Sequence, residues 1–267
     1  MMILNKFFPW LRKHALNVQS LPCSMTMRLT DTSPKCPNLG VNFIQHCTKL
    51  SGKHKIYELR TYTSHPKDFK EFLKLTEENF HLRTKHSKLI GYWTSEIGGL
   101  NEVVHIWEYD SYIHRTSVRQ NLASDPEWLS AYISKAAPAW MKQDNVSMSL
   151  FPWSQINTPH KMGVYELQEF NMIGYIKDWE EPLKVFVDLS VDCFQNASSS
   201  LIGAWEVQFG PQNTVFVLWQ HQSFDKMKEG KKLLLQETNE QILRSFYTLV
   251  GSAHCKALLS HKVSPLQ

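Results

Sequence analysis

Residues 89–93 of this 267-residue chain read LIGYW, and residues 201–205 read LIGAW. Each copy is followed by a tryptophan at the same distance, Trp107 after the first and Trp219 after the second. A self-similarity at a fixed offset of 112 residues indicates two copies of one folding unit. The chain is therefore predicted to contain two tandem repeats, and a repeat of about 110 residues has the size of an ordinary domain.

Each repeat is predicted to fold as a β-α-β-β-α-β unit, the ferredoxin-like split unit. Alternating β-prone residues indicate strands, and apolar residues at helical spacing indicate helices. In repeat one the strands are expected at residues 56–63, 88–97, 102–109 and 146–151. The first helix is expected to begin near Pro66 and to span about 18 residues. The second helix is expected to be capped by Asp110 or Ser111 and to run through Leu122, and a capping box at 124–127 restarts it. In repeat two the strands are expected at 164–170, 201–209, 213–219 and 255–260, and the helices near 179–195 and 224–250.

The third strand of repeat one is apolar on both faces. Val103, His105 and Trp107 point one way. Val104 and Ile106 point the other way, and helices can cover only one of the two faces. Leaving roughly eight inner side chains per repeat exposed would forfeit roughly 12–24 kcal/mol. The predicted fold class is therefore α+β, with two tandem ferredoxin-like β-α-β-β-α-β repeats packed sheet to sheet as a single-chain dimeric-α/β-barrel-type fold.

Charge divides the chain unevenly. The predicted divisions are a basic leader and linker at 1–55, repeat one at 56–152, a connector at 153–163 and repeat two at 164–267. The leader carries eight Lys/Arg against one acidic residue, whereas the remainder carries 21 against 24. A slightly acidic globular part argues against nucleic-acid binding, which needs a basic patch on the folded domain.

The leader has the composition of a mitochondrial transit peptide. From Met1 to Thr30 it contains no acidic residue, and its basic residues alternate with large apolar ones. The alternative is a disordered tail. No later apolar stretch approaches the roughly 18 or more residues that a membrane-spanning helix needs. The five cysteines form no C-x-x-C pair and are expected to be free thiols in a reducing compartment: Cys23, Cys36, Cys47, Cys193 and Cys255.

Several motifs of repeat one resemble the NipSnap family, and most closely its third, shorter subgroup. They are YELRTY at 57–62, HLRTKHS at 81–87, GYW at 91–93, GG at 98–99 and HIWEYDSYIHR at 105–115. The resemblance covers residues 56–267 but is weaker in repeat two. It implies a dimeric α/β-barrel fold in a mitochondrial or mitochondrion-associated protein. Relatives are linked to vesicular transport and to recruiting autophagy machinery to damaged mitochondria. No catalytic residues are established for the family, so none are carried across.

Tyr57, Trp93, His105 and Trp107 are the candidates for a small-molecule pocket. The resemblance adds that barrels of this superfamily include haem-degrading and quinol-type monooxygenases. A histidine on an apolar strand could bind an acidic ligand or act as a base. The simpler interpretation is a core histidine satisfied by one hydrogen bond. Repeat two has Val217 at that position, so such a site would exist in one copy only, whereas the repeated tryptophan is interpreted as a packing element.

Other polar residues give weaker signals. His81 and His86 are five residues apart on a helix and do not share a metal-facing side. Arg83, His114 and Arg115 could form an anion-binding surface, but such residues are more often solvated or paired. No catalytic, phosphate-loop or metal motif occurs, so neither a cofactor nor a metal is predicted.

Two functions follow from these observations. The first is a non-enzymatic mitochondrial interaction or adaptor protein with protein partners, in which peripheral membrane association and higher oligomers are left open. The alternative is a small-molecule-binding α/β barrel, a haem- or quinone-type monooxygenase centred on His105.

Overall fold

The computed structural model describes residues 55–159 and 162–267, in which eight antiparallel strands form one closed barrel. The strand order around the barrel is β1-β3-β2-β8-β5-β7-β6-β4, so the four strands of each repeat stay together. This confirms the predicted fold class. Residues 1–54, which include the predicted transit peptide and three of the cysteines, lie outside the described residues. The strands are β1 Ile56–Ser64, β2 Lys88–Ile97, β3 Glu102–Tyr109, β4 Trp140–Leu150, β5 Val164–Met172, β6 Ser199–Phe209, β7 Thr214–His221 and β8 Val250–Ser260.

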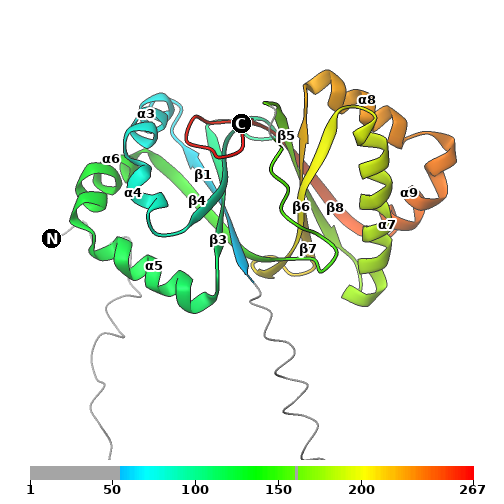
Figure 1. Cartoon of the computed structure of the whole chain (residues 1–267), viewed down its shortest axis with the longest axis horizontal. Coiled ribbons are helices and arrows are strands. Elements are labelled where there is room, and N and C mark those ends of the chain that lie inside the picture. The colour runs from blue at the N-terminus through cyan, green and yellow to red at the C-terminus, as the bar shows by residue number, and fades with distance from the viewer. Residues whose placement is uncertain (1–54, 160–161) are drawn as a thin grey trace, which may run out of the picture. The chain divides into compact units, whose positions relative to one another are not determined.

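The helices of the two repeats lie on opposite sides of the strands (Figure 1). No helix in the described part of the chain is long and apolar enough to cross a membrane. Repeat one contributes α3 Phe69–Asn79, α4 His81–Thr84, α5 Tyr112–Ser124, the π-helical η2 Trp128–Ile133, α6 Ser134–Ala136 and η3 Ala137–Ala139. Repeat two contributes α7 Ile176–Gln195, α8 Phe224–Leu234, η4 Glu237–Asn239 and α9 Glu240–Tyr247.

Three apolar cores result, and the alternation along each strand assigns residues to them. Val104 and Ile106 of β3 pack inside the barrel, against side chains of repeat two. Val103 and Trp107 of the same strand pack outward, under the helices of repeat one. Repeat two has its own core between sheet and helices. Both faces of each half-sheet are therefore buried, as the sequence predicts.

The repeated LIGxW motif is explained by a β-bulge. The register between β2 and β3 shifts between Leu89 and Gly91, and β6 and β7 show the same shift between Leu201 and Gly203. A Cβ on Gly91 would lie 2.2 Å from the ring of Trp93, which is fully buried in the barrel. The glycine is needed because the indole of the tryptophan two positions later lies against its Cα.

Inside the barrel the aromatic residues pair across the repeats. The rings of Tyr57 and Trp205 lie 6.0 Å apart in an edge-to-face arrangement. Their counterparts, Tyr165 and Trp93, lie 5.4 Å apart. Each repeat thus supplies one tyrosine and one tryptophan to the core of the other, and neither half completes this core alone.

The segments after β4 and β8 close the barrel in matching ways. Ser154 accepts a hydrogen bond from the backbone N–H of Ala204 at 2.9 Å. Ser264 accepts the equivalent bond from Tyr92 at 3.0 Å. Two residues after each serine, an apolar side chain packs on the barrel core: Ile156 in the connector and Leu266 near the C-terminus. The connector and the C-terminal tail therefore occupy equivalent places.

The predicted starts of the two last strands are wrong. β4 begins at Trp140 and not at 146, and β8 begins at Val250 and not at 255. β4 pairs with β6 only over Ser147–Leu150, so its first half has an open edge with exposed polar side chains. Such a half-strand lacks the apolar alternation that a sequence pattern detects.

The predicted helices are also interrupted. The first ends at Asn79 and resumes at His81, and the region 224–250 is broken by the short η4 turn. The cap at 124–127 is not a capping box. Asp125 alone accepts the backbone N–H groups of Glu127 and Trp128, at 2.9 and 3.1 Å, because its extended backbone places its carboxylate over the first turn.

Substituting Gly91 by Ala is expected to destabilise the protein by about 1–3 kcal/mol or more, because the new methyl overlaps a ring that has no room to move. Gly203→Ala should cost less, since its Cβ would lie 2.8 Å from Trp205. Gly251→Ala is the control, with its nearest atom at 3.3 Å on the half-exposed Ile173. Chemical denaturation measures all three. Equal stabilities of G91A and G251A would contradict this account of the motif.

Candidate functional site

The four predicted pocket residues lie on opposite faces of one sheet. Tyr57 and Trp93 point into the barrel, where the Tyr57 hydroxyl donates to Glu108 at 3.2 Å. His105 and Trp107 point outward, to the layer between sheet and helices. Because the sheet separates the two pairs, the four residues do not line one pocket.

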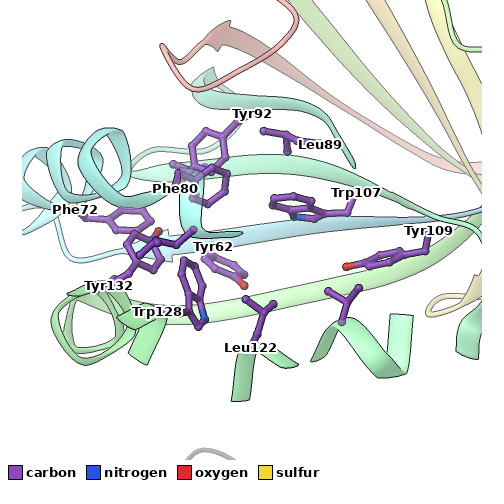
Figure 2. Close-up of a cluster of buried hydrophobic side chains, with 14 of the residues drawn as sticks. Tyr62, Phe72, Phe80, Leu89, Tyr92, Trp107, Tyr109, Leu122, Trp128 and Tyr132 are labelled. Atoms are coloured by element: carbon purple, nitrogen blue, oxygen red, sulfur yellow. The ribbon is translucent and has the colours of Figure 1, made fainter. Parts of the chain in front are cut away.

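His105 is held in an aromatic layer, part of which is shown in Figure 2. The indole N–H of Trp107 donates to His105 Nδ1 at 2.6 Å, and the Tyr92 ring stacks on the imidazole at 5.2 Å. Burial lowers the pKa of His105 well below its usual value, and the nearby Arg60 and Arg83 lower it further. The ring is therefore neutral, with Nδ1 as an acceptor, which matches a core histidine satisfied by one hydrogen bond.

Trp107 and Trp219 have matching packing roles. Each is 1% exposed, and each indole N–H has an acceptor: His105 for the first, and Gln168 Oε1 at 3.1 Å for the second. Replacing either tryptophan with Ala is expected to cost about 3–5 kcal/mol through lost burial and a cavity. His105→Val should cost about 1–3 kcal/mol, because it leaves the Trp107 N–H buried without an acceptor.

Thermal unfolding of W107A, W219A and H105V side by side measures these costs. The structural interpretation requires both tryptophan variants to melt well below H105V. If W107A melts like the wild type, or if H105V abolishes a ligand-induced rise in melting temperature, the packing interpretation of this strand is wrong.

A polar cluster lies beside this aromatic layer, centred on Glu58 of β1. The strand register places the residues of this cluster in two cross-strand rows on the outer face of the sheet. Trp107 of β3 and Ser147 of β4 flank Glu58. His105 and Asn145 flank the next outward residue, Arg60. Helix α5 adds Arg115 and Arg119, and its buried Val118 and Leu122 pack in the aromatic layer.

Glu58 is buried and accepts hydrogen bonds at both carboxylate oxygens. Oε1 accepts from Arg115 at 2.7 Å and from Asn145 at 2.6 Å, with Arg60 Nε 3.8 Å away. Oε2 accepts from the Tyr109 hydroxyl at 3.1 Å. Burial acts to raise the pKa of Glu58, but Arg60, Arg115 and Asn145 outweigh it and lower the pKa to about 2. The carboxylate is therefore charged at any physiological pH.

Arg83 extends the cluster into the aromatic layer. Its guanidinium donates to Ser87 at 2.7 Å and to the Tyr109 hydroxyl at 2.9 Å. Its charged centre also lies 3.8 Å above the Trp107 ring, a cation–π contact. Burial lowers the pKa of Arg83, and Arg60 adds to the effect. Hydrogen bonds and the face of an aromatic ring thus stabilise the Arg83 cation, which has no ion pair among the described residues.

The second repeat has an equivalent but smaller cluster, centred on Glu166. Lys231 Nζ lies 2.7 Å from its Oε1, and His221 Nε2 lies 3.2 Å from its Oε2. The thiol of Cys255 lies 3.0 Å from Oε1. Burial opposes ionisation, but His221 and Lys231 prevail and lower the pKa of Glu166 to about 2. A buried carboxylate at this position is thus a feature of the repeat.

The remaining predicted polar residues do not come together in one site. His114 Nδ1 accepts from the backbone N–H of Asp110, while Arg83 and Arg115 belong to the Glu58 cluster, so these three residues do not form an open anion surface. His81 and His86 are part of no metal site: no group of three or more His, Cys, Asp or Glu side chains within 55–159 and 162–267 could hold an ion. Cys193 and Cys255 are free thiols.

Sequence reasoning missed the residues at the centre of this cluster: Glu58, Arg60, Arg119 and Asn145. A signal for one of them was present. The same Tyr-Glu-Leu sequence opens both repeats. An acidic residue that recurs at the same position of a strand, when both faces of that strand are buried, indicates a buried carboxylate with the same structural role in each repeat. The arginines gave no comparable signal, because only the strand pairing and the packing of α5 bring them together.

The comparisons with known proteins agree with this architecture. The NIPSNAP family model matches residues 57–155 and 161–265. Protein NipSnap homolog 3B of Mus musculus is 41% identical over 177 residues, which is 66% of this chain and 70% of the relative. Protein NipSnap homolog 3A of Homo sapiens is 40% identical with the same coverage.

A solved structure of a candidate monooxygenase from Lactobacillus acidophilus also matches, with a TM-score of 0.55. It covers 80% of this chain and 99% of its own at 12% identity, so the likeness shows the fold alone. The sequence matches go further, because the family model spans both repeats. The chain belongs to the NIPSNAP family.

Proposed function

We propose that this chain is a non-enzymatic interaction protein of the NipSnap type that works at mitochondria. The observation that carries the proposal is an exposed apolar patch built by both repeats. Tyr112 and Ile113 open helix α5, and Phe209 ends strand β6. The Tyr112 and Phe209 rings meet edge to face at 5.5 Å, and Ile113 is 84% exposed.

The patch has the properties of a protein-docking surface. The Tyr112 hydroxyl is hydrogen-bonded to Ser147 at 2.8 Å, which holds the ring in place. Rigid aromatic side chains are enriched at protein interfaces because little side-chain entropy is lost when they are covered. The partner that fits is a protein with an apolar surface of its own. Its identity would decide between vesicular transport and mitochondrial quality control as the process served.

Quantitative pull-down of the tagged full chain from mitochondria tests the docking surface. Ile113→Asp and Phe209→Ser should each remove the same partner. Leu235→Asp is the matched control, since Leu235 is 71% exposed but lies after α8 in the other repeat. The control should retain that partner. An identical set of captured proteins for all three variants and the wild type would refute this use of the patch.

The enzymatic alternative has its own test. The purified protein would be titrated with haem, flavins and quinones while its absorption spectrum is recorded. The neutral His105, whose Nδ1 is already engaged by Trp107, supports the expectation of no saturable change. A saturable spectral change that His105→Val abolishes would replace the adaptor proposal with a small-molecule site.

Localisation is part of the proposal and rests on the acid-free, basic start of the chain. Residues 1–40 fused to a fluorescent protein are expected to enter or coat mitochondria. A fusion in which the basic residues of this segment are replaced by Gln is the control and should lose the signal. Diffuse cytosolic or secretory fluorescence of the unaltered fusion would contradict the proposal.

A further inference from the structure

The cluster around Glu58 holds more positive than negative charge. Four guanidinium groups lie in it, those of Arg60, Arg83, Arg115 and Arg119, whereas Glu58 is the one carboxylate that pairs with them among the described residues. Burial lowers the pKa of Arg119, and repulsion from Arg60 and Arg115 lowers it further. Like charges gathered in a partly buried layer destabilise one another unless an anion joins them.

Two of these arginines have no hydrogen bond in the described part of the chain. Arg60 has a single ion-pair contact, 3.8 Å from Glu58, and its Nε is fully buried without a hydrogen-bond partner. Arg119, which is partly buried on α5, has neither a hydrogen bond nor an ion pair there. Tyr62 lies with them: its ring faces the Arg60 guanidinium at 5.3 Å, and it interacts electrostatically with Arg119.

Repeat two shows that the fold does not need this surplus. Its buried Glu166 is balanced by Lys231, which stands on α8 where Arg119 stands on α5. Gln168 takes the place of Arg60, and Met227 takes the place of Arg115. The same architecture therefore buries the same carboxylate with fewer cations. The additional arginines of repeat one call for a separate explanation.

We propose that repeat one binds a small oxyanion, the carboxylate or phosphate group of a small molecule, between Arg60, Arg119 and Tyr62. A guanidinium presents a planar fork of N–H donors that matches two oxygens of a carboxylate or phosphate. The Tyr62 hydroxyl adds a third donor, and its oxygen points to the side where α5 carries Leu122 (Figure 2). The side chain of Arg60 is 19% exposed and Arg119 is partly exposed on α5, so both side chains are in contact with solvent.

This site goes beyond the proposed interaction function, because it needs no protein partner. It also differs from the pocket suggested by the sequence, because neither His105 nor Trp107 is a ligand-binding group in it. Glu58 has a positioning role: its Oε1 accepts hydrogen bonds from Arg115 and Asn145, whereas Arg60 makes only the 3.8 Å ion-pair contact with it and keeps its hydrogen-bond donors for the anion.

Calorimetric titration of the full chain with inorganic phosphate and, separately, with succinate tests the proposal. Wild type should bind at least one of them saturably at millimolar concentration, and the arm that succeeds distinguishes a phosphate from a carboxylate group. Arg119→Gln and Arg60→Gln should each weaken binding about tenfold or more, since each removes charge-assisted hydrogen bonds. Lys228→Gln makes the same change of charge on exposed α8 and should bind as the wild type does.

Melting temperatures without ligand add an independent measurement. R119Q should melt at or above the wild-type temperature, because it removes a repelling charge, while losing the anion-induced rise. This variant lies on a partly exposed helix face, so it keeps the test valid if R60Q fails to fold. Failure of wild type to bind either anion saturably, or wild-type affinity in R119Q, would overturn the proposal.

Discussion

The first repeat expressed alone, as residues 50–155, is expected to aggregate or to dimerise through its inner sheet face. That face contributes seven buried side chains to the barrel core: Tyr57, Leu59, Ile90, Trp93, Val104, Ile106 and Met148. Exposing them forfeits roughly 10–20 kcal/mol at about 1.5–3 kcal/mol each. The loss equals or exceeds the net stability of a typical domain, about 5–15 kcal/mol.

Size-exclusion chromatography with light scattering, followed by thermal melting, measures this outcome. Residues 50–267 are the control and should melt cooperatively as one unit. Adding the second half to the first should recover a folded species, because the Tyr–Trp pairs form across the two halves. A soluble, monomeric first half with its own cooperative melt would show that the repeats are independent.

Acidification is expected to lower the free energy of unfolding by about 7 kcal/mol, the second large effect. Glu58 and Glu166 each have a folded pKa of about 2 against an ordinary 4.5. A carboxylate with a depressed folded pKa binds fewer protons when folded, so its contribution is present above pH 4.5 and is lost as the pH falls to about 2. Each shift corresponds to about 3–4 kcal/mol at about 1.4 kcal/mol per pKa unit, which gives about 7 kcal/mol for the two carboxylates together.

Urea unfolding at a series of pH values between 7 and 2 measures this loss. Glu58→Gln should lower the stability at pH 7, because it leaves buried arginines unpaired, and should make the acid limb shallower. Glu96→Gln, on an exposed glutamate of β2, is the control and should follow the wild type. An acid limb of E58Q as steep as that of E96Q would exclude Glu58 as a source of the pH dependence.

Much of the fold could be predicted because local pattern and long-range packing agree in it. Strands β2 and β3 begin and end at the residues predicted from the alternating sequence pattern. Both faces of β3 are apolar, so both have to be buried, and the barrel buries the face that the helices leave uncovered. The prediction was wrong where tertiary context decides. The first halves of β4 and β8 are exposed and pair along one edge only, so their sequences lack the apolar alternation of a buried strand. The short η4 turn interrupts a region that has helical spacing throughout.

The candidate site was predictable only in its apolar part. Buried tryptophans at one repeat position indicate packing, and the structure places both where that interpretation requires. Arg60 and Arg119 are 59 positions apart and look like ordinary solvated cations in the sequence. Their proximity depends on the register of β1 with its two neighbours, β3 and β4, and on the position in which α5 packs on that sheet. No local pattern encodes either.

The closed barrel has a consequence for the order of events during synthesis. Its seams join distant segments: the bond from Tyr92 to Ser264 spans 172 residues. Strand β2 also pairs with β8, and the β8 residues in this pairing extend to Ser260, so the pairing forms only after β8 has been synthesised. Contacts of such long sequence separation make folding slow. A nascent chain cannot close its barrel until β8 and the segment through Ser264 have left the ribosome, and until then the apolar inner face of repeat one has no complete intramolecular cover.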